Sequence, residues 1–209
     1  MSIVTKNFLV CRDLDVLKKL AERQAAMVLV SITTLDADLT RRMEPRTSVP
    51  RRRLEAIGQL RAAGIPVGVM VAPVIPGLTD HEIPGILQAA KAAGTGFAGM
   101  SVLRLPHGVA ELMENWLEQH FPDRKEKVLG RIRAIRGGKL NDSRFGSRMR
   151  GTGKWAEQIK QLFDVAKRKA GFERGFPELS TAGFVKAGQM ELGVREEEPG
   201  TRYARPSAC

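Results

Sequence analysis

Lys6, Ser31, Thr33 and Ala72 are the residues of this chain best placed to do chemistry, because each stands at or near the end of an apolar segment. A lysine at such a position can pair with a carboxylate or a phosphate, hydroxyl groups can bind a ribose, and backbone groups around Ala72 can bind the edge of an adenine. If the segments are neighbouring parallel strands, these groups meet at one rim of the sheet. The set would then suit a nucleoside that carries an amino-acid-like tail.

The sequence motifs of several common enzyme classes are absent. The chain has no G-x-x-x-x-G-K-[ST], no G-x-S-x-G, no H-E-x-x-H, and no G-x-G-x-x-G after an expected strand. His81, His107 and His120 occur singly, so we expect them to be surface or capping residues. Cys11 and Cys209 lie near opposite ends of the chain, a spacing that suggests neither a disulfide framework nor a zinc site.

The stretch Val67–Asp80 is the element around which the rest of the chain is organised. Its first residues are apolar in both alternation phases and rich in valine, which predicts a strand covered on both faces. Pro73 has no N–H for a strand ladder, so we expect the strand to end near Ala72. Thr79 and Glu82 have the spacing of a capping box, which predicts that a helix follows at once.

The other periodic segments complete an alternation of strands and helices. We expect further strands at 2–10, 27–33 and 99–105, and helices at 13–24, 52–63 and 83–93. Repeated strand–helix–strand units predict an α/β fold with a parallel sheet. The hydroxyl cluster after the second strand has two readings, because it could serve chemistry or cap a short helix at 37–43.

Beyond Pro106 the pattern predicts helices alone, at 109–120, 125–136 and 155–169. Between the last two lies a basic loop, 139–154, in which an aromatic residue, Phe145, stands among the cations. These cations are Arg144, Arg148, Arg150 and Lys154. The loop could clamp a phosphate backbone, or its cations could pair with the protein's own carboxylates. We expect three parts: the strand–helix alternation at 1–106, a helical basic region at 107–172, and a disordered tail at 173–209.

Composition narrows the choice of function class. The chain has 209 residues, of which 43% are hydrophobic, enough for a sizeable core. No apolar run is long enough to span a membrane and no signal-peptide pattern stands at the start, so we expect a cytoplasmic protein. The formal net charge of +11 is consistent with an ordinary basic surface or with nucleic acid as a partner.

A family resemblance is carried by the series VTKN, VSITTLD, RRMEPR, RLEAIGQLRAAGIPVGVMVAPVIPGLTDHE and GMSVLRLP. It resembles the later strands of the TIM-like barrel of radical S-adenosylmethionine (radical SAM) enzymes, in particular the spore-photoproduct-lyase-like group often labelled DNA repair photolyases. The run HFPDRKEKVLGRIRAIRGGKLNDSRFGSRMRG resembles the C-terminal extension of one bacterial subfamily of that group. The resemblance covers about residues 2–170 and implies a partial (β/α) barrel at 1–106 and a lyase-like enzyme.

The resemblance also implies roles for individual residues. Lys6 matches the strand-end lysine that contacts the methionine carboxylate of the cofactor, and Ser31 matches a serine that contacts the cofactor. Ala72 matches the backbone position beside the adenine, and Thr33 lies at the same strand end as Ser31. The implied cofactors are S-adenosylmethionine and, in the full-length family, a [4Fe–4S] cluster.

The sequence departs from that family at the cluster. The family binds its [4Fe–4S] cluster through a C-x-x-x-C-x-x-C loop, and this chain has only Cys11 and Cys209, which cannot supply three clustered thiolates. We therefore expect the chain to be the C-terminal portion of a longer protein and to be inactive alone, because the cofactor supplies the radical chemistry. We also expect association through an open, apolar sheet edge at the 2–10 strand.

Two other function classes remain open at this stage. A nucleic-acid-binding module would use the basic C-terminal region, and its binding would depend strongly on salt. A barrel lyase would use Lys6 to form a Schiff base, which requires an unusually depressed lysine pKa in a dry pocket.

Overall fold

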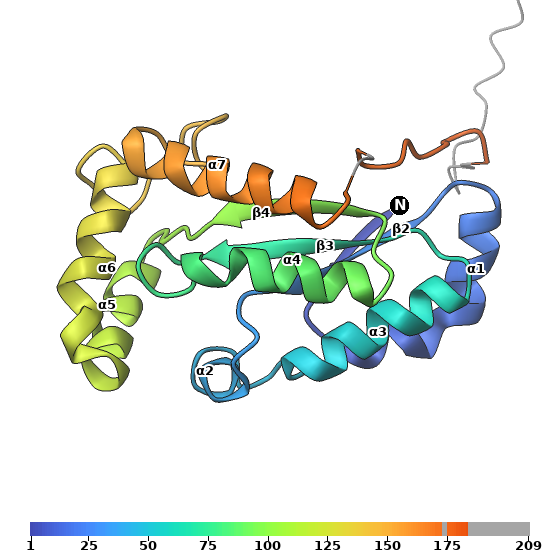
Figure 1. The fold of residues 1–209 in the computed structure, drawn as a ribbon, viewed down its shortest axis with the longest axis horizontal. Coiled ribbons are helices and arrows are strands. Elements are labelled where there is room, and N and C mark those ends of the chain that lie inside the picture. Colours follow the sequence, from blue (N-terminus) through green and yellow to red (C-terminus); the bar gives the residue numbers. More distant parts are fainter. Residues whose placement is uncertain (173–174, 184–209) are drawn as a thin grey trace, which may run out of the picture.

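The computed structural model describes residues 1–172 and 175–183, and within them the strands form one parallel sheet (Figure 1). The order of the strands is β1-β2-β3-β4, the same as their order in the chain. They are β1 (Ser2–Thr5), β2 (Met27–Ile32), β3 (Val67–Val74) and β4 (Phe97–Val102). All three strand pairs are parallel, which confirms the predicted α/β class and is compatible with part of a radical SAM barrel.

Helices follow each strand. They are α1 (Leu14–Glu22), α2 (Ala37–Met43), α3 (Pro50–Ala62), α4 (Ile83–Ala92), α5 (Val109–His120), α6 (Pro122–Ile135) and α7 (Lys154–Lys169), with short 3-10 turns η1 (Phe8–Asp13) and η2 (Asp80–Glu82). Figure 1 shows α3 and α4 along one side of the sheet, α7 along β4, and α5 with α6 beyond the carboxyl end of β3. The helices expected after Pro106 are present, while the division of the chain at 106 and 172 stays a prediction.

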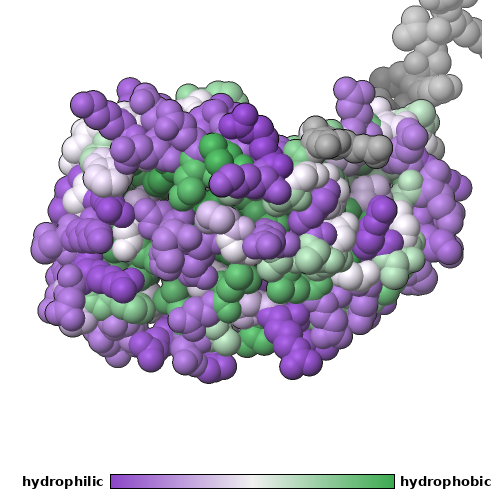
Figure 2. All heavy atoms as spheres, viewed as in Figure 1, coloured by the Kyte–Doolittle hydropathy of each residue, from purple (hydrophilic) through white to green (hydrophobic). Residues whose placement is uncertain are grey.

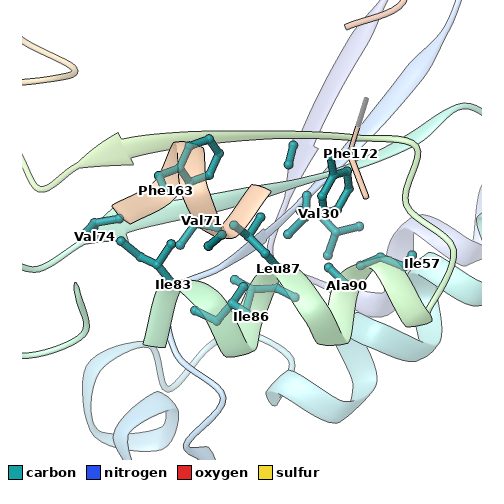
Figure 3. Close-up of a cluster of buried hydrophobic side chains, with 14 of the residues drawn as sticks. Val30, Ile57, Val71, Val74, Ile83, Ile86, Leu87, Ala90, Phe163 and Phe172 are labelled. Atoms are coloured by element: carbon teal, nitrogen blue, oxygen red, sulfur yellow. The ribbon is translucent and has the colours of Figure 1, made fainter. Parts of the chain in front are cut away.

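The main core lies on one face of the sheet. Alternate residues of β2 and β3, such as Val30, Val69 and Val71, pack with apolar side chains of α3 and α4 (Figure 3). Helix α7 adds Phe163 to the same cluster. The outer surface on this side is mostly hydrophilic, with apolar patches between (Figure 2), as expected for amphipathic helices.

A second apolar cluster lies at the carboxyl ends of the strands. It joins the turn after β3 to α2, α5 and α6 through fully or almost fully buried side chains. Its buried members are Leu39, Ile75, Leu78, Leu105, Leu117, Val128, Leu129 and Ile132. This cluster fixes the segments that surround the strand ends.

All four strands end at other residues than the pattern predicted. β2 ends at Ile32, one residue early, and β4 runs from Phe97 to Val102 where 99–105 was predicted. β1 stops at Thr5 instead of reaching Val10, because the side chain of Asn7 accepts a hydrogen bond from Leu9 N and starts the turn η1. β3 continues past Ala72 to Val74, but its pairing with β4 is irregular between Val71 and Val74. The proline after Ala72 therefore interrupts the ladder without ending the strand.

The predicted capping box after β3 is wrong. Thr79 Oγ1 accepts a hydrogen bond from Ile75 N, 3.0 Å away, and so closes the turn that precedes the helix. Glu82 instead accepts hydrogen bonds from Thr34 Oγ1 at 2.6 Å and from Leu35 N at 2.8 Å. A long-range contact to the end of β2 has replaced the local cap.

The predicted tail is described in part. Phe176 packs against Phe97 with ring centroids 5.1 Å apart, and Ser180 N donates to the carbonyl of Gln24. Residues 173–174 and 184–209, which hold most of that tail, lie outside the described residues. The predicted association through the edge of β1 also stays a prediction.

Candidate functional site

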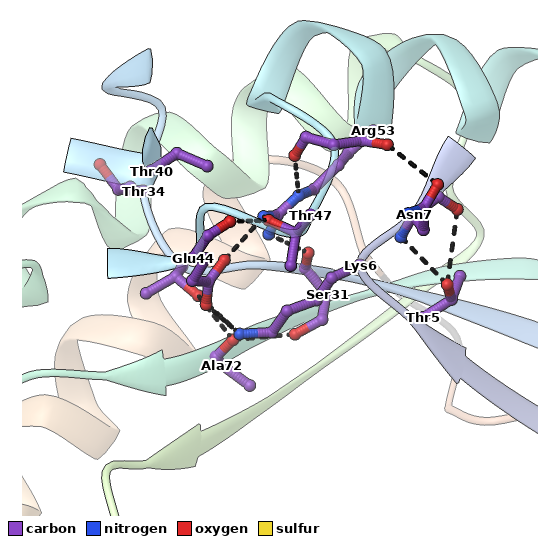
Figure 4. A network of polar contacts seen from close by, with 12 residues as sticks. Thr5, Lys6, Asn7, Ser31, Thr34, Thr40, Glu44, Thr47, Arg53 and Ala72 are labelled. Atoms are coloured by element: carbon purple, nitrogen blue, oxygen red, sulfur yellow. Dashed lines mark hydrogen bonds and ion pairs between the residues drawn. The ribbon is translucent and has the colours of Figure 1, made fainter. Parts of the chain in front are cut away.

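The carboxyl ends of β1, β2 and β3 bring together the four residues that the sequence singled out (Figure 4). Lys6 follows β1 directly, Ser31 and Thr33 lie at the end of β2, and Ala72 lies near the end of β3. Because these strands are adjacent and parallel, their ends share one edge of the sheet. The predicted convergence at one rim is present in the structure.

The carbonyl oxygen of Ala72 is the point where β2 and β3 are cross-linked. Ser31 Oγ donates to it over 2.8 Å, and Thr33 Oγ1 lies 2.9 Å from the same oxygen. Thr33 Oγ1 also lies 2.9 Å from Glu44 Oε1, so the single hydroxyl proton of Thr33 can serve one of these acceptors at a time. Both hydroxyl side chains are buried.

One carboxylate, Glu44, stands between two cations. Lys6 Nζ forms an ion pair with Glu44 Oε1 and donates to Thr33 Oγ1 over 3.2 Å. Arg53 Nη2 bonds the other carboxylate oxygen, Oε2, over 2.6 Å. The side chain of Glu44 is 10% exposed and that of Lys6 is 30% exposed, so solvent reaches the group through Lys6.

Arg53 is the buried cation of this group, and only 1% of its side chain is exposed. It enters from α3 and donates through Nε to Ser48 O at 2.7 Å and through Nη1 to Ser31 O at 2.9 Å. Nη2 also donates to Thr47 Oγ1 at 2.6 Å. An arginine stays charged in a protein, so its burial requires this set of acceptors. Arg53 thereby fixes the loop before α3 to the end of β2.

The Lys6–Glu44–Arg53 group carries a net positive charge. Burial alone would raise the pKa of Glu44, but the hydrogen bonds and charges of Lys6 and Arg53 outweigh it and lower the pKa below its ordinary value. Glu44 is therefore a carboxylate at neutral pH. Lys6 and Arg53 together carry one more positive charge than Glu44 neutralises, and Lys6 is the exposed one of the two cations.

Sequence reasoning missed Glu44 and Arg53 as members of the site. Arg53 stands four and seven residues before Ile57 and Leu60, on the face of α3 that is buried. A cation on an apolar helix face needs a buried partner, and this signal was available from the helical period alone. Nothing in the local pattern tied Glu44 to Lys6, because the two are 38 positions apart.

The basic loop is attached to the sheet at the end of β4, where Val102 N donates to the carbonyl of Met149. Arg144 pairs with Asp142, with Nε 3.0 Å from Oδ1, and this pairing together with a hydrogen bond from Ser147 holds the pKa of Asp142 well below its usual range. The guanidinium of Arg148 lies 5.2 Å from the ring centroid of Phe145, whose side chain is 90% exposed. One predicted cation is therefore paired internally, and another stands over an exposed aromatic ring.

Arg136, which the sequence did not single out, anchors that loop. Its guanidinium donates to Ser147 O at 3.2 Å, to Arg148 O at 2.8 Å and to Leu103 O at 2.8 Å. The backbone of Met149 accepts a hydrogen bond from Val102 N, at the end of β4. The loop is thus fixed to the sheet, and Lys154 begins α7 directly after it.

A cavity of about 580 Å³ adjoins the sheet on the face that carries Ser31. Met70 is the register partner of Ser31, and Gly99 is the register partner of Met70, so these residues form one row across three strands. Met70 and Gly99 line the cavity together with Phe176, α7 residues between 156 and 164, and Arg150 of the basic loop. The cavity has room for a small organic molecule.

The described residues do not provide ligands for an iron–sulfur cluster. Within 1–172 and 175–183, no group of three or more His, Cys, Asp or Glu side chains could hold a metal ion. Cys11 is half-buried in η1, with its Sγ 3.9 Å from Ala56 O, and burial raises the pKa of its thiol. Cys209 lies outside the described residues. The thiolate set that a [4Fe–4S] cluster needs is therefore not assembled in this part of the chain.

Comparison with known proteins relates part of the chain to a superfamily. Residues 1–90 match the model of the radical SAM superfamily, which uses S-adenosylmethionine and, in general, a [4Fe–4S] cluster. This match spans β1 to β3, all four predicted site residues, Glu44 and Arg53. No solved structure matches the chain significantly. Among the helices described, none is both long and apolar enough to cross a bilayer.

Relatives of the chain are longer proteins. The uncharacterized proteins Rv2578c of Mycobacterium tuberculosis and Mb2609c of Mycobacterium bovis are each 39% identical over 105 residues, which is 48% of this chain and 31% of theirs. The uncharacterized protein MJ0683 of Methanocaldococcus jannaschii is 29% identical over 128 residues, 61% of this chain and 46% of its own length. The chain thus matches about a third to a half of the length of these relatives.

Proposed function

We propose that the rim formed by Lys6, Ser31, Thr33 and Ala72 binds S-adenosylmethionine, in a DNA repair photolyase-like (spore-photoproduct-lyase-like) protein of the radical SAM superfamily. The observation that supports this most is the convergence of an exposed ammonium, two hydroxyls and a backbone carbonyl at three adjacent strand ends. These groups all lie within the residues that match the superfamily.

The charged residues of the rim fit the methionine end of S-adenosylmethionine in particular. The surplus positive charge of the Lys6–Glu44–Arg53 group suits the carboxylate of the methionine part, which Lys6 reaches from the solvent side. The hydroxyl oxygens of Ser31 and Thr33 can accept hydrogen bonds while Ser31 donates its proton to Ala72 O and Thr33 donates its proton to Ala72 O or to Glu44 Oε1. Bound S-adenosylmethionine would supply a radical precursor, and we assign to these residues its binding and orientation.

Cleavage of the cofactor is not assigned to this chain. The superfamily cleaves S-adenosylmethionine reductively at its cluster, and the described residues hold no ligand set for that cluster. The photolyase-like reaction is accordingly proposed for a longer protein that contains both parts. The cavity beside Met70 and Gly99, one strand away from Ser31, gives room for a substrate next to the proposed cofactor site.

Isothermal titration calorimetry with S-adenosylmethionine tests the proposal. A charge-assisted hydrogen bond contributes about 1.5–3 kcal/mol, so Lys6→Ala should weaken binding by about tenfold or more. Lys18→Ala is the matched control, because Lys18 is an exposed residue of α1, remote from the strand ends, and should leave the affinity unchanged. Equal effects of the two substitutions, or undetectable binding to the parent chain, would refute the site.

A second candidate function, nucleic-acid binding, is favoured by Phe145 and Arg148. An exposed aromatic ring beside a guanidinium can stack a base while the net charge of +11 attracts phosphates. Phe145→Ala should weaken binding of a single-stranded oligonucleotide in fluorescence anisotropy, with Leu162→Ala on α7 as the control. Binding that is insensitive to salt and to Phe145→Ala would reject this function.

The Schiff-base alternative has no support in the geometry. Lys6 Nζ is held in an ion pair with Glu44, and an ion-paired ammonium is not a nucleophile.

A further inference from the structure

Glu44 uses its two carboxylate oxygens in different ways. Oε2 faces Arg53, which is buried and fixed by three further hydrogen bonds to Ser48, Ser31 and Thr47. Oε1 faces Lys6, whose four-carbon side chain is partly exposed. One half of the carboxylate is thus bound to a fixed cation and the other half to a cation that can move.

We propose that Glu44 is an internal counter-ion that occupies Lys6 until the carboxylate of a ligand displaces it, while Arg53 keeps Glu44 in place. This inference rests on the proposed function, because it takes the ligand to be an amino-acid-bearing nucleoside. It makes Glu44 a residue that sets the affinity of the site for a carboxylate, although Glu44 itself need not touch the ligand.

The exchange leaves no buried group without a partner. When Lys6 turns to the ligand, Glu44 Oε2 keeps its bond to Arg53. Oε1 loses Lys6, but the Thr33 hydroxyl already lies 2.9 Å away and can donate its proton there. Ala72 O then still accepts from Ser31 Oγ at 2.8 Å. Because two hydroxyls bond the Ala72 carbonyl, the Thr33 hydroxyl can turn to Glu44 while the carbonyl keeps one hydrogen bond.

A purely structural Glu44 would give different consequences. In that case its carboxylate would only cross-link α2 and α3 to the strand ends, and its loss would loosen the whole rim. All ligands would then bind more weakly. A displaceable counter-ion competes only with ligands that bring a carboxylate.

Calorimetry with two probes separates the two roles. S-adenosylhomocysteine carries the amino-acid tail, and 5′-methylthioadenosine has the same nucleoside without it. Glu44→Gln keeps the shape of the side chain and removes the competing charge, so we expect S-adenosylhomocysteine to bind several-fold more tightly, up to about fivefold if one ion pair is relieved. The affinity for 5′-methylthioadenosine should stay unchanged. Glu55→Gln, at an exposed pair with Arg52, is the control and should change neither affinity.

The outcomes distinguish this inference from the proposed function. If Glu44→Gln weakens both probes, Glu44 is structural and the inference alone fails. If the parent chain binds neither probe, the proposed function fails and the inference fails with it. Should Glu44→Gln not fold, NMR of the parent chain decides: the Glu44 side-chain carboxyl ¹³C resonance should shift with S-adenosylhomocysteine and not with 5′-methylthioadenosine. Equal shifts, or no shift, with the two probes would overturn the inference.

Discussion

Replacing Arg53 by methionine should be among the most damaging single substitutions in this chain. The change removes four hydrogen bonds donated to Ser48 O, Ser31 O, Glu44 Oε2 and Thr47 Oγ1, from a side chain that is 1% exposed. Removal of one partner of a buried ion pair costs about 3–5 kcal/mol. That amount is a large part of the total stability of an ordinary domain, about 5–15 kcal/mol.

Urea denaturation followed by circular dichroism measures this loss. Arg51→Met is the matched control, because Arg51 begins the same helix but is exposed, and its replacement should change the free energy of unfolding by about 0.5 kcal/mol or less. The double variant Arg53→Met/Glu44→Gln should lose less than the sum of the two single variants, since neither group then leaves a buried charge unpaired. Equal losses for Arg51→Met and Arg53→Met, or strict additivity in the double variant, would refute the coupling described for this site.

Three further predictions concern Glu44, Gly68 and the edge of β1. The pKa of Glu44 is lowered in the folded state, so its contribution to stability is complete above the ordinary glutamate pKa of about 4.3 and is lost as the pH falls through the folded-state pKa. Urea midpoints measured against pH should lose this contribution in the Glu44→Gln variant. Gly68→Ala should lower the melting temperature through a loss of about 1–3 kcal/mol, since the added Cβ would meet the Phe97 ring and lie 2.9 Å from Phe97 O. Gly130→Ala on α6 is the control and should not lower it, because the added Cβ there meets nothing within 4 Å. Val4, 62% exposed on the edge strand β1, should promote association, so Val4→Lys should shift sedimentation toward the monomer, and an unchanged profile would contradict a role for that edge.

The parts of the fold that follow from local chemistry could be predicted from the sequence. The valine-rich run of β3 and the proline and glycine residues after it signalled a strand and a turn, and α5 has the predicted bounds, Val109–His120. The convergence of Lys6, Ser31 and Ala72 followed from strand order in a parallel sheet, without knowledge of any contact. Local periodicity and the geometry of parallel strands were sufficient for these features.

The parts that depend on long-range partners could not be read in this way. Glu82 had the spacing of a local cap, but a contact to Thr34 and Leu35, 48 and 47 positions away, was preferred. Glu44 could not be identified as a site residue from the sequence, because its role depends on Lys6 and Arg53, which approach it from two other elements. A carboxylate is equally suited to solvent, to a cap or to an ion pair, and only the three-dimensional neighbours decide among these uses.

The strand order of the sheet has a consequence for how the chain folds during its synthesis. The strands pair in the order in which they are synthesised, so β2, β3 and β4 each follow a strand with which they pair. Every polar group of the rim, from Lys6 to Ala72, has been made before α4 begins. Phe163 of α7, which completes the apolar cluster on the opposite face, arrives much later. All residues of the polar rim are therefore synthesised well before the α7 residues that complete the apolar cluster.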